Sequence, residues 1–456
     1  MKNYDVIIVG AGFSGIYAAW KLAKSGCSVV LLEANNFLGG NLSSHQWKNF
    51  WLDNGTHTFD MRTEPEERFF RDILGENIQV WTDHNWASTT DKTWTYGFEM
   101  PDFSKDFPIL ADQALTDLKH IKEASHSGLK TDCYSDAFIH SHGSILSAAI
   151  LPLVHKFTGS DPTKFSVDAR QSLTIFDRPK LGTDKDMITL KQSDPFWDKR
   201  LGVSLSCGDN RYYGKSVTMK YCYPAKQGLN GFCVSARRRL DELGVTIKLE
   251  HIVTDIRQDG KGITVQTGNS SFSADNLFWS LPQIGLSKIL KTGIDLTKSF
   301  VPVGVCLFAF EVPKECIKGP DYLHDFHPDR VSFRYNKMGV YSQQIQSNGN
   351  TVVMAEVPTH PAGISKRATN NMSKIVWKNI CDAGFVTPNT WPIDSTCWGL
   401  PVTFTLPKTG WSNTVTKVQD IIKTTVPNLH SIAFGSRGRS QGMSYYDSHI
   451  HQQLQP

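Results

Sequence analysis

The sequence lacks the charge runs and repeats that mark several special classes of protein. Its 48 lysine and arginine residues and 44 aspartate and glutamate residues leave a formal charge of only +4, without any basic run. Nucleic-acid-binding domains normally carry a clustered basic surface, so we expect no nucleic-acid partner. The chain also contains no internal repeat and no low-complexity segment, which argues against a solenoid or a disordered protein.

The cysteines do not form the pattern of a disulfide framework or of a metal site. There are nine of them, an odd number, and they are scattered without CxxC spacing. This favours reduced thiols in a cytoplasmic protein. The pairs His140/His142 and His449/His451 have HxH spacing but no evident third ligand, so we expect no metal.

Long apolar runs are also missing. No stretch approaches the roughly 20 apolar residues that a membrane span requires, and the run from Val6 to Val9 is too short for a signal peptide. We therefore expect no membrane span and a cytoplasmic location. With 456 residues, of which 40% are hydrophobic and 20% charged, the chain is expected to form two or three globular domains.

Residues 5–33 have the pattern of a dinucleotide-binding βαβ unit. A buried-strand run leads into Gly10-Ala-Gly12-Phe-Ser-Gly15, and a helical pattern and a second apolar run follow, ending at Glu33. Gly10 permits the tight turn, Gly12 admits the pyrophosphate, and Gly15 lets the helix pack on the strand. Glu33 stands where an acid would accept a hydrogen bond from a ribose hydroxyl. The expected cofactor-binding residues here are Gly10, Gly12, Phe13, Ser14, Gly15, Glu33 and Ala34.

A glycine pair follows the acid. The stretch Glu33-Ala-Asn-Asn-Phe-Leu-Gly39-Gly40 resembles the extended fingerprint of the FAD-binding glutathione-reductase-like superfamily, in its amine-oxidase branch. In that branch the glycine pair brings the chain back beside the flavin and the pyrophosphate, where two missing Cβ atoms relieve crowding. The resemblance implies FAD as the cofactor and adds Gly39 and Gly40 to its binding site.

The next residues favour one family within that branch. Amine oxidases, protoporphyrinogen oxidases and phytoene desaturases usually continue the glycine pair with arginine, whereas Asn41 here resembles UDP-galactopyranose mutase. The stretch Asp53-Asn-Gly-Thr-His57-Thr-Phe is similar to the Gly-Pro-His-x-Phe-His segment of that family, with Asp60 in place of its second histidine. The resemblance implies that Asn41 and His57 contact the cofactor and that His57 assists catalysis. By itself, His57 could also be an ordinary loop histidine.

The C-terminal segment carries a further resemblance. Gly438-Arg439 followed by Tyr445-Tyr-Asp447 is similar to the Gly-Arg, five residues, Tyr-Tyr-Asp pattern of the mutases. This implies that Arg439 and Tyr445 bind a diphosphate and take part in catalysis, and that Asp447 begins a helix against the flavin. The alternative interpretation makes Arg439 a surface charge and Asp447 a simple N-cap.

Two positions depart from the mutase pattern. Met443 replaces a tyrosine, and Ser204 stands where the family has a second active-site arginine. Arg170 or Arg178 could supply that missing charge.

Looser resemblances connect the two ends of the chain. The segment HKFTGSDPTKF, residues 155–165, is similar to a mutase segment with a Lys-Gln-Trp-Gly-x-Asp-Pro core. The segment DNRYY resembles an Asp-Asn-Tyr-Phe element, which implies substrate contacts for Tyr212 and Tyr213. Val253 falls where the family holds the adenine end of FAD through backbone groups.

These patterns predict an α/β fold: a Rossmann-like FAD-binding domain with an inserted helical segment and an antiparallel-sheet substrate domain. We expect residues 1–60, 215–290 and 400–456 to form the FAD domain, 61–214 a mainly helical insertion, and 291–400 the antiparallel sheet. Trp81, Trp86 and Trp94 in the insertion could stack on a base or a sugar, or simply fill a core.

The resemblance implies an FAD-dependent enzyme acting on a nucleotide-diphosphate sugar. The specific expectation is a mutase-like pyranose/furanose isomerase in which N5 of the reduced flavin is the nucleophile, with NAD(P)H or another reductant as a possible partner. The alternatives are an FAD oxidoreductase of the amine oxidase or protoporphyrinogen oxidase kind, or a flavoprotein catalysing another step on a sugar nucleotide. The sugar and the oligomeric state stay open.

Overall fold

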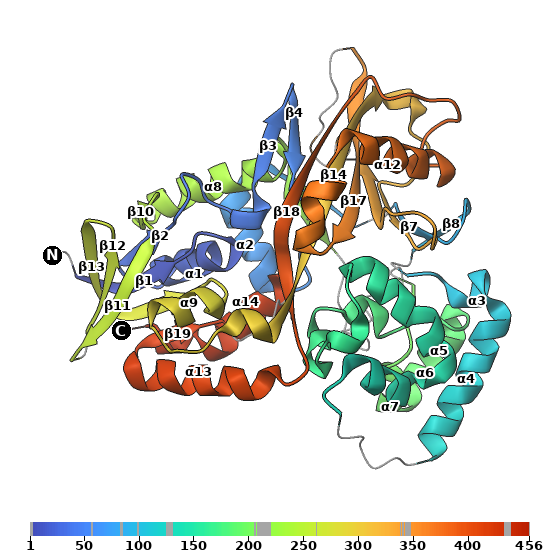
Figure 1. Cartoon of the computed structure of the whole chain (residues 1–456). Helices are drawn as coiled ribbons and strands as arrows, with labels where there is room; N and C mark the ends of the chain where they lie inside the picture. The colour runs from blue at the N-terminus through green and yellow to red at the C-terminus, as the bar shows by residue number, and fades with distance from the viewer. Residues whose placement is uncertain are drawn as a thin grey trace.

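The structure is a computed structural model of the chain (Figure 1). It describes residues 3–55, 58–82, 85–97, 100–124, 131–204, 207, 220–260, 262–337, 339, 342, 348–432 and 439–455. Figure 1 shows three units: a layered α/β unit on the left, an antiparallel sheet at the upper right and a group of helices below that sheet.

The α/β unit is built on a sheet in the order β10-β2-β1-β13-β12-β11, with β19 paired to β13. Strands β10, β2, β1, β13 and β19 run parallel, whereas β11 and β12 form an antiparallel meander with the first half of β13. The strands are β1 (Asn3–Val9), β2 (Val29–Leu32), β10 (Thr246–Lys248), β11 (Val253–Asp259), β12 (Gly262–Thr267), β13 (Ser270–Trp279) and β19 (Leu429–Ser431).

Helices cover both faces of this sheet, which explains the continuous apolar run of β1. Val6 and Ile8 face the core formed with α1, α2, α8 and α14, while Ile7 and Val9 face the core formed with α9 and α13. Alternate side chains of a strand point to opposite faces, so each face needs its own apolar set. The helices are α1 (Phe13–Lys24), α2 (Glu64–Leu74), α8 (Gly228–Glu242), α9 (Gln283–Ile289), α13 (Trp411–Thr425) and α14 (Arg439–His449).

The antiparallel sheet has the order β18-β14-β17-β16-β15-β7-β8. One face packs against α12 and the other against the hairpin β3–β4 of the α/β unit. Its elements, with that hairpin and the two helices beside the sheet, are β3 (Ser44–Trp47), β4 (Phe50–Asp53), β7 (Trp86–Thr89), β8 (Trp94–Tyr96), β14 (Phe300–Pro313), β15 (Tyr322–Asp325), β16 (Arg334–Lys337), β17 (Asn350–Thr359), β18 (Asp394–Pro407), α11 (Ile364–Arg367) and α12 (Asn370–Asp382).

A small sheet in the order β5-β9-β6 contacts two of these units: Cys222 and Tyr223 of β9 lie in the core of the α/β unit, and Tyr221 packs with Trp86 and Tyr322 of the antiparallel sheet. The helical unit packs below the antiparallel sheet. The core of the helical unit includes Val301, Val303 and Leu406 of the sheet, so the two units share one apolar interior. The remaining strands and helices are β5 (Phe59–Asp60), β6 (Ile78–Trp81), β9 (Tyr221–Pro224), α3 (Phe103–Asp106), α4 (Pro108–Glu123), α5 (Tyr134–Thr158), α6 (Asp184–Ser193) and α7 (Pro195–Asp198). Short 3₁₀ turns lie at Gly40–Leu42, Pro162–Lys164, Val167–Gln171, Thr174–Phe176, Leu296–Ser299, Lys314–Cys316, Pro361–Gly363 and His451–Gln453.

The expected boundaries of the helical insertion are too wide. We expected residues 61–214 to form it, but α2 packs into the core of the α/β unit through Phe69 and Phe70. Strands β7 and β8 join the antiparallel sheet, because β7 pairs in parallel with β15. The insertion is therefore divided among all three units. An apolar helix face or strand edge does not reveal from its own sequence which neighbour will cover it.

Helix α5 corrects the expectation that no apolar stretch is long enough to span a membrane. By length and composition α5 could do so, although just under half of its most apolar stretch is buried inside the protein. Within α5, Gly143 has non-helical backbone angles, and Pro152 lies inside the helix. Apolar core helices of globular domains meet the same two criteria, so the match alone is weak evidence for a membrane segment.

Candidate functional site

The glycine loop between β1 and α1 has the geometry that its sequence motif predicts. Gly10 has a φ of +94°, in the left-handed region that favours glycine. A Cβ atom on Gly15 would lie 1.8 Å from the carbonyl oxygen of Gly10, so α1 approaches the loop too closely for any side chain there. A Cβ on Gly12, by contrast, would meet nothing within 4 Å. Gly12 therefore borders open space, where a pyrophosphate would approach the backbone.

Helix α1 offers its N-terminus to that space. Gly12 is its N-cap residue, and no side chain caps the helix. The N–H groups of the first turn, at Phe13 and Ser14, therefore have no capping acceptor and, with the helix dipole, favour an anion. The ring of Phe13 anchors the turn by packing on Phe59 and Phe232, with centroids 6.2 and 6.3 Å away.

Glu33 lies directly after β2 and is 6% exposed. Its Oε2 accepts a hydrogen bond of 2.7 Å from the N–H of Ala11, and its Oε1 accepts one of 2.9 Å from the N–H of Asn35. The acid thus joins the glycine loop to the exposed turn that begins at Ala34. Each carboxylate oxygen can accept more than one hydrogen bond, so a ribose hydroxyl can still be bound.

The segment after β10 runs alongside this acid. The N–H of Glu33 donates to the carbonyl of Lys248 at 2.9 Å, and the N–H of His251 donates to the carbonyl of Glu33 at 2.8 Å. Val253 begins β11 two residues later and is 9% exposed. The backbone near Val253 thus lies on the side of the loop where the adenosine half of a dinucleotide is expected.

The glycine pair passes directly against the glycine loop. The N–H of Gly39 donates to the carbonyl of Ala11 at 2.7 Å, and φ is +111° at Gly39 and +55° at Gly40. A Cβ on Gly39 would lie 2.3 Å from Sγ of Cys233. The exposed Asn41 then donates from Nδ2 to the carbonyl of Thr403 in β18 at 3.1 Å, which connects this turn to the antiparallel sheet.

The open side of Gly12, the uncapped start of α1, the buried acid and the tight passage of the glycine pair fit the adenosine-diphosphate half of FAD. These residues would hold that half of the cofactor, with Glu33 at the ribose and the first turn of α1 at the pyrophosphate. His57, expected near the flavin, and Tyr212 and Tyr213, expected at the substrate, lie outside the described residues.

Arg439 lies at the start of α14, near two other arginines. Its Nη2 donates to the carbonyl of Thr58 at 2.7 Å, and its guanidinium lies 5.3 Å from the ring centroid of Phe59. Burial lowers the pKa of Arg439; nearby Asp60 raises it, whereas nearby Arg334 and Arg62 lower it further. The expected phosphate-binding residue therefore lies in a partly buried region crowded with positive charge.

Arg334 and Arg62 come from different parts of the chain. Arg334, on β16, forms an ion pair with Glu356 and donates to the hydroxyl of Tyr322 at 2.5 Å. Arg62, just after β5, forms an ion pair of 2.7 Å with Asp60. Our sequence reasoning missed both. An arginine inside the apolar pattern of a strand, as in VSFRYN, was the available signal for Arg334.

The two arginines proposed from sequence as the second charge are elsewhere. Arg170 forms an ion pair of 2.7 Å with Asp177, and Nε of Arg178 donates to the carbonyl of Asp198 at 3.0 Å. Both interactions lie within the helical unit and connect segments of that unit to each other. Arg62 and Arg334, not Arg170 and Arg178, are the arginines beside Arg439.

The expected start of the last helix is wrong. Helix α14 begins at Arg439, and Asp447 lies near its end. The carboxylate of Asp447 accepts a hydrogen bond of 2.9 Å from the hydroxyl of Tyr17 and forms an ion pair of 2.5 Å with Lys21, both on α1. Asp447 thus holds α14 against α1 and caps no helix. The expectation fails because the segment from Ser440 to Ser444 is already helical.

Tyr445 does not share a face of α14 with Arg439. The helical repeat places the two residues about 120° apart around the axis, and the ring of Tyr445 stacks on His449 with centroids 4.5 Å apart. Met443, which replaces a family tyrosine, is 4% exposed and belongs to the core beneath α1.

Aromatic side chains line the sheet next to Arg334. Trp86 packs on Tyr221 and Tyr322, with ring centroids 5.1 and 5.2 Å away, and Trp81 packs against the same cluster. These two tryptophans therefore lie near the arginines, whereas Trp94 donates from Nε1 to the carbonyl of Ala383 at 3.0 Å and fills a core. Among the described residues no group of His, Cys, Asp or Glu is arranged to hold a metal ion.

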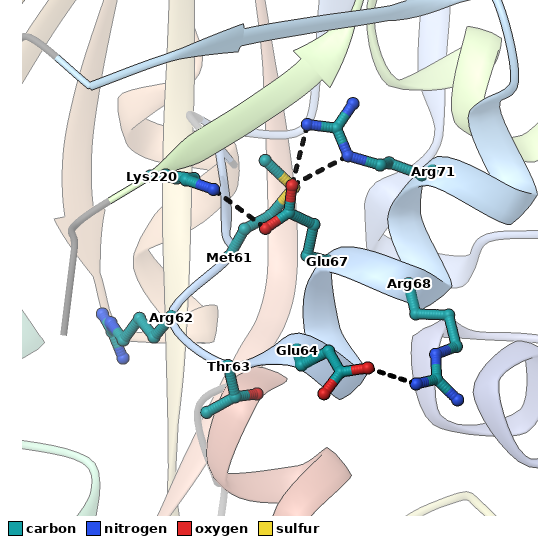
Figure 2. Close-up of a pocket in the computed structure, with 8 residues that line it drawn as sticks. All are labelled: Met61, Arg62, Thr63, Glu64, Glu67, Arg68, Arg71 and Lys220. Atoms are coloured by element: carbon teal, nitrogen blue, oxygen red, sulfur yellow. Dashed lines mark hydrogen bonds and ion pairs between the residues drawn. The ribbon is translucent and has the colours of Figure 1, made fainter.

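A basic pocket of about 490 Å³ opens beside Arg62 (Figure 2). Glu67 is shared by Lys220 at 3.1 Å and Arg71 at 2.8 Å, while Arg62 points away from these pairs. The charged side chains that line the pocket are Arg62, Arg68, Arg71, Lys220, Glu64 and Glu67. Cations outnumber carboxylates in this lining, so the pocket beside Arg62 favours anions.

Comparisons with known proteins agree on the nucleotide-binding region. A family model described as an NAD(P)-binding Rossmann-like domain matches residues 8–74. The chain is 58% identical over 38 residues to thiamine thiazole synthase of Aeropyrum pernix, a match covering 8% of this chain and 14% of that protein. It is 36% identical over 62 residues to a probable flavin-containing monoamine oxidase A of Dictyostelium discoideum, covering 12% and 14%. It is 41% identical over 56 residues to 4,4'-diaponeurosporene oxygenase of Staphylococcus aureus, covering 12% and 11%. The matched segments span about a seventh or less of these relatives.

Solved structures match over nearly the whole chain. Reduced UDP-galactopyranose mutase is 16% identical with a TM-score of 0.67, covering 100% of this chain and 92% of that one. A putative protoporphyrinogen oxidase from an Exiguobacterium species is 14% identical with a TM-score of 0.68, covering 98% of each chain. Cyclohexylamine oxidase from Brevibacterium oxydans is 14% identical with a TM-score of 0.63, covering 99% of each.

Such low identities show a shared fold and leave the reaction open. The expected fold class is confirmed: the chain has the Rossmann-like dinucleotide-binding domain and antiparallel-sheet substrate domain of UDP-galactopyranose mutase and these oxidases, and FAD is the cofactor that its loop geometry fits.

Proposed function

We propose that the protein is an FAD-dependent enzyme that acts on a nucleotide-diphosphate sugar, as a pyranose/furanose isomerase. One observation carries the proposal: Arg439 of α14 lies over the ring of Phe59, and Arg334 of β16 and Arg62 of the turn after β5 lie close enough to lower its pKa. Guanidinium groups bind diphosphates through paired, permanently charged donors.

The arginines themselves favour an anionic substrate over an amine. Arg334 forms an ion pair with Glu356 and Arg62 forms one with Asp60, and both arginines lie close enough to Arg439 to lower its pKa. An ammonium group would add a further positive charge beside three guanidinium groups. Amine substrates, such as those named for cyclohexylamine oxidase and putrescine oxidase, therefore fit this region less well.

The residues have separable tasks in this reaction. Arg439 would bind the diphosphate oxygens, and Arg334 would share their negative charge as the bond to the sugar breaks. The hydroxyl of Tyr322, held by Arg334 and lying 2.9 Å from Nε2 of His324, would orient the sugar. Reduced FAD, when bound, would supply the nucleophilic nitrogen for the anomeric carbon. His57, Tyr212, Tyr213 and Tyr445 keep their expected catalytic and substrate-binding roles as proposals.

The decisive experiment is an assay of the dithionite-reduced holoprotein with a panel of sugar nucleotides. The proposal requires pyranose/furanose interconversion only with reduced flavin and without net redox change. Hydrogen peroxide formed in air from an amine, without any interconversion, would instead support an oxidase. NAD(P)H can be tested as reductant in place of dithionite.

Variants test the arginines separately from the reaction. Arg439→Ala and Arg334→Met should each weaken binding of UDP by about 2–5 kcal/mol if they clamp a buried diphosphate. Arg178→Gln, in the helical unit, is the matched control and should leave the dissociation constant unchanged. If all three variants bind UDP with the same dissociation constant as the unmodified protein, Arg439 and Arg334 do not belong to the substrate site.

A further inference from the structure

A second cavity, of about 890 Å³, lies between the helical unit and the antiparallel sheet. One wall comes from α5 and the 3₁₀ turn that follows it, and the other from the segments after β15 and at the end of β17. In the described part of the chain, no residue of the glycine loop or the arginine cluster lines it. A cavity of this size at an interface between structural units is typical of a small-molecule site.

A buried carboxylate, Asp325, lies behind the lining residues Lys156 and Arg330 and is fully used by other groups. Asp325, with a fully buried side chain, accepts hydrogen bonds from the N–H of His327 at 2.9 Å, from Arg330 at 3.1 Å and from the hydroxyl of Tyr335 at 2.8 Å. Arg330 is also 3.8 Å from the exposed carboxylate of Asp91. These contacts satisfy Asp325 and Arg330 without help from a ligand.

Lys156, at the end of α5, is the second cation near Asp325, after Arg330. Its Nζ donates to the carbonyl of His327 at 2.6 Å but lies 3.8 Å from Asp325, beyond hydrogen-bonding distance. An ammonium group has three N–H donors, and the side chain of Lys156 is only 12% exposed. Among the described residues it has one hydrogen bond, and because Lys156 lines the cavity its other donors can serve an acceptor placed there.

The electrostatic environment of Lys156 agrees with this geometry. Burial lowers its pKa to about 8, Arg330 lowers it as well, and Asp325 opposes both. An anion placed beside the ammonium group would offset the cost of burying that charge.

The rest of the lining is mixed. Apolar side chains of Ile139, Leu151, Leu153, Phe326 and Val331 form much of it, and Ile139 is 44% exposed. His155 and Arg367 also line the cavity, and Nη1 of Arg367 donates to the carbonyl of Pro358 at 3.4 Å. The lining carboxylates, which are exposed at the rim, are those of Asp136, Asp161 and Asp329. A ligand that fits has one anionic end at Lys156 and an apolar body along the wall.

We propose that this cavity binds an organic monocarboxylate with an apolar body, whose carboxylate accepts hydrogen bonds from Lys156. The site is independent of the FAD site and of the reaction proposed above. A small polar anion would leave the apolar wall uncovered, and an uncharged chain would leave the donors of Lys156 without acceptors.

Calorimetric titration of the FAD-loaded protein with sodium decanoate tests the proposal. Decanoate should bind, and decanol should bind at least about 10-fold more weakly because it lacks the charge. Lys156→Met should weaken the binding of decanoate by a similar factor. Lys164→Met, on the neighbouring exposed turn, should leave the affinity for decanoate unchanged. Decanol binding as tightly as decanoate, or equal affinity in Lys156→Met, would overturn the proposal.

One further variant and one competition experiment test where decanoate binds. Ile139→Glu places an acid on a partly exposed wall position, so it should fold normally and weaken decanoate at least about 5-fold by repulsion. Saturating UDP should leave decanoate affinity unchanged. Competition by UDP would make the cavity part of the nucleotide site and would refute a separate carboxylate site, whatever the outcome of the isomerase assay.

Discussion

Glu33 and Ala11 are joined by a hydrogen bond of 2.7 Å that runs from the backbone N–H of the glycine loop to the acid after β2. This bond fixes the loop before any cofactor arrives, because the carboxylate is buried and holds the exposed turn at Asn35 as well. One side chain therefore shapes the loop and, by our proposal, binds the ribose.

Replacing Glu33 by glutamine should weaken FAD binding. Glutamine has one acceptor oxygen, so either the N–H of Ala11 or that of Asn35 loses its partner, and the ribose contact weakens too. We expect a loss of about 1.5–3 kcal/mol in FAD affinity, measured by flavin fluorescence titration. Glu250→Gln, at an exposed neighbouring position, is the control. Unchanged affinity in Glu33→Gln would contradict the role of the acid.

Gly15 and Gly12 should respond differently to the same substitution. Gly15→Ala forces a methyl group to within 1.8 Å of the Gly10 carbonyl, so the apoprotein should lose about 1–3 kcal/mol of stability. Gly12→Ala meets open space at an ordinary φ of −73°, so the apoprotein should keep its stability while the methyl group obstructs the pyrophosphate. Thermal melting with and without FAD separates the two effects. Normal FAD binding by Gly12→Ala would show that the pyrophosphate lies elsewhere.

Asp53 should make stability depend on pH in an unusual direction. Burial raises its pKa from 3.8 to about 6, against the hydrogen bonds from Ser44, Tyr223 and the N–H of Leu229. The folded state then holds this proton more tightly than the unfolded state, so the contribution of Asp53 to stability falls as pH rises from about 4 to about 6 and is constant above that range.

Asp53→Asn removes this titration while keeping the acceptor for Ser44 and Leu229. Relative to the unmodified protein, the variant should gain about 3 kcal/mol as pH rises from about 4 to about 7. Melting temperatures of the two proteins across that range provide the measurement. A difference that stays constant with pH would refute the raised pKa.

Asp447 should matter for the packing of α14 on α1 and not for the flavin. Asp447→Asn weakens the ion pair with Lys21 and the hydrogen bond from Tyr17, so we expect a loss of about 1 kcal/mol in stability. A double-mutant cycle with Tyr17→Phe should give a coupling energy of similar size. The flavin absorption spectrum should be unchanged in both variants. A shifted spectrum in Asp447→Asn would restore the original expectation that this residue contacts the cofactor.

The dinucleotide loop could be predicted because its determinants are contiguous in the chain. The clash that a side chain at Gly15 would cause arises within one βαβ unit. The apolar run of β1 is likewise a local pattern, although helices from distant segments cover it. The glycine pair is equally local, since Gly39 returns to Ala11 through a single hydrogen bond. The ordinary sterics and periodicity of short segments were enough for these features.

The last helix shows where pattern matching failed. Asp447 follows two tyrosines as the family pattern requires, yet α14 starts at Arg439 and turns Asp447 toward Tyr17. A helix boundary depends on which tertiary contacts stabilise its ends, and Tyr17 lies far away in sequence.

By itself the sequence determined the dinucleotide fold and its cofactor class, because backbone sterics and alternating burial act between near neighbours. Only the tertiary structure decided which charges meet. Strand order and register brought Arg334 of β16 beside Arg439 and Arg62, and left Arg170 and Arg178 with partners inside the helical unit. Electrostatic interaction depends on distance in space, and distance along the chain carries no information about it.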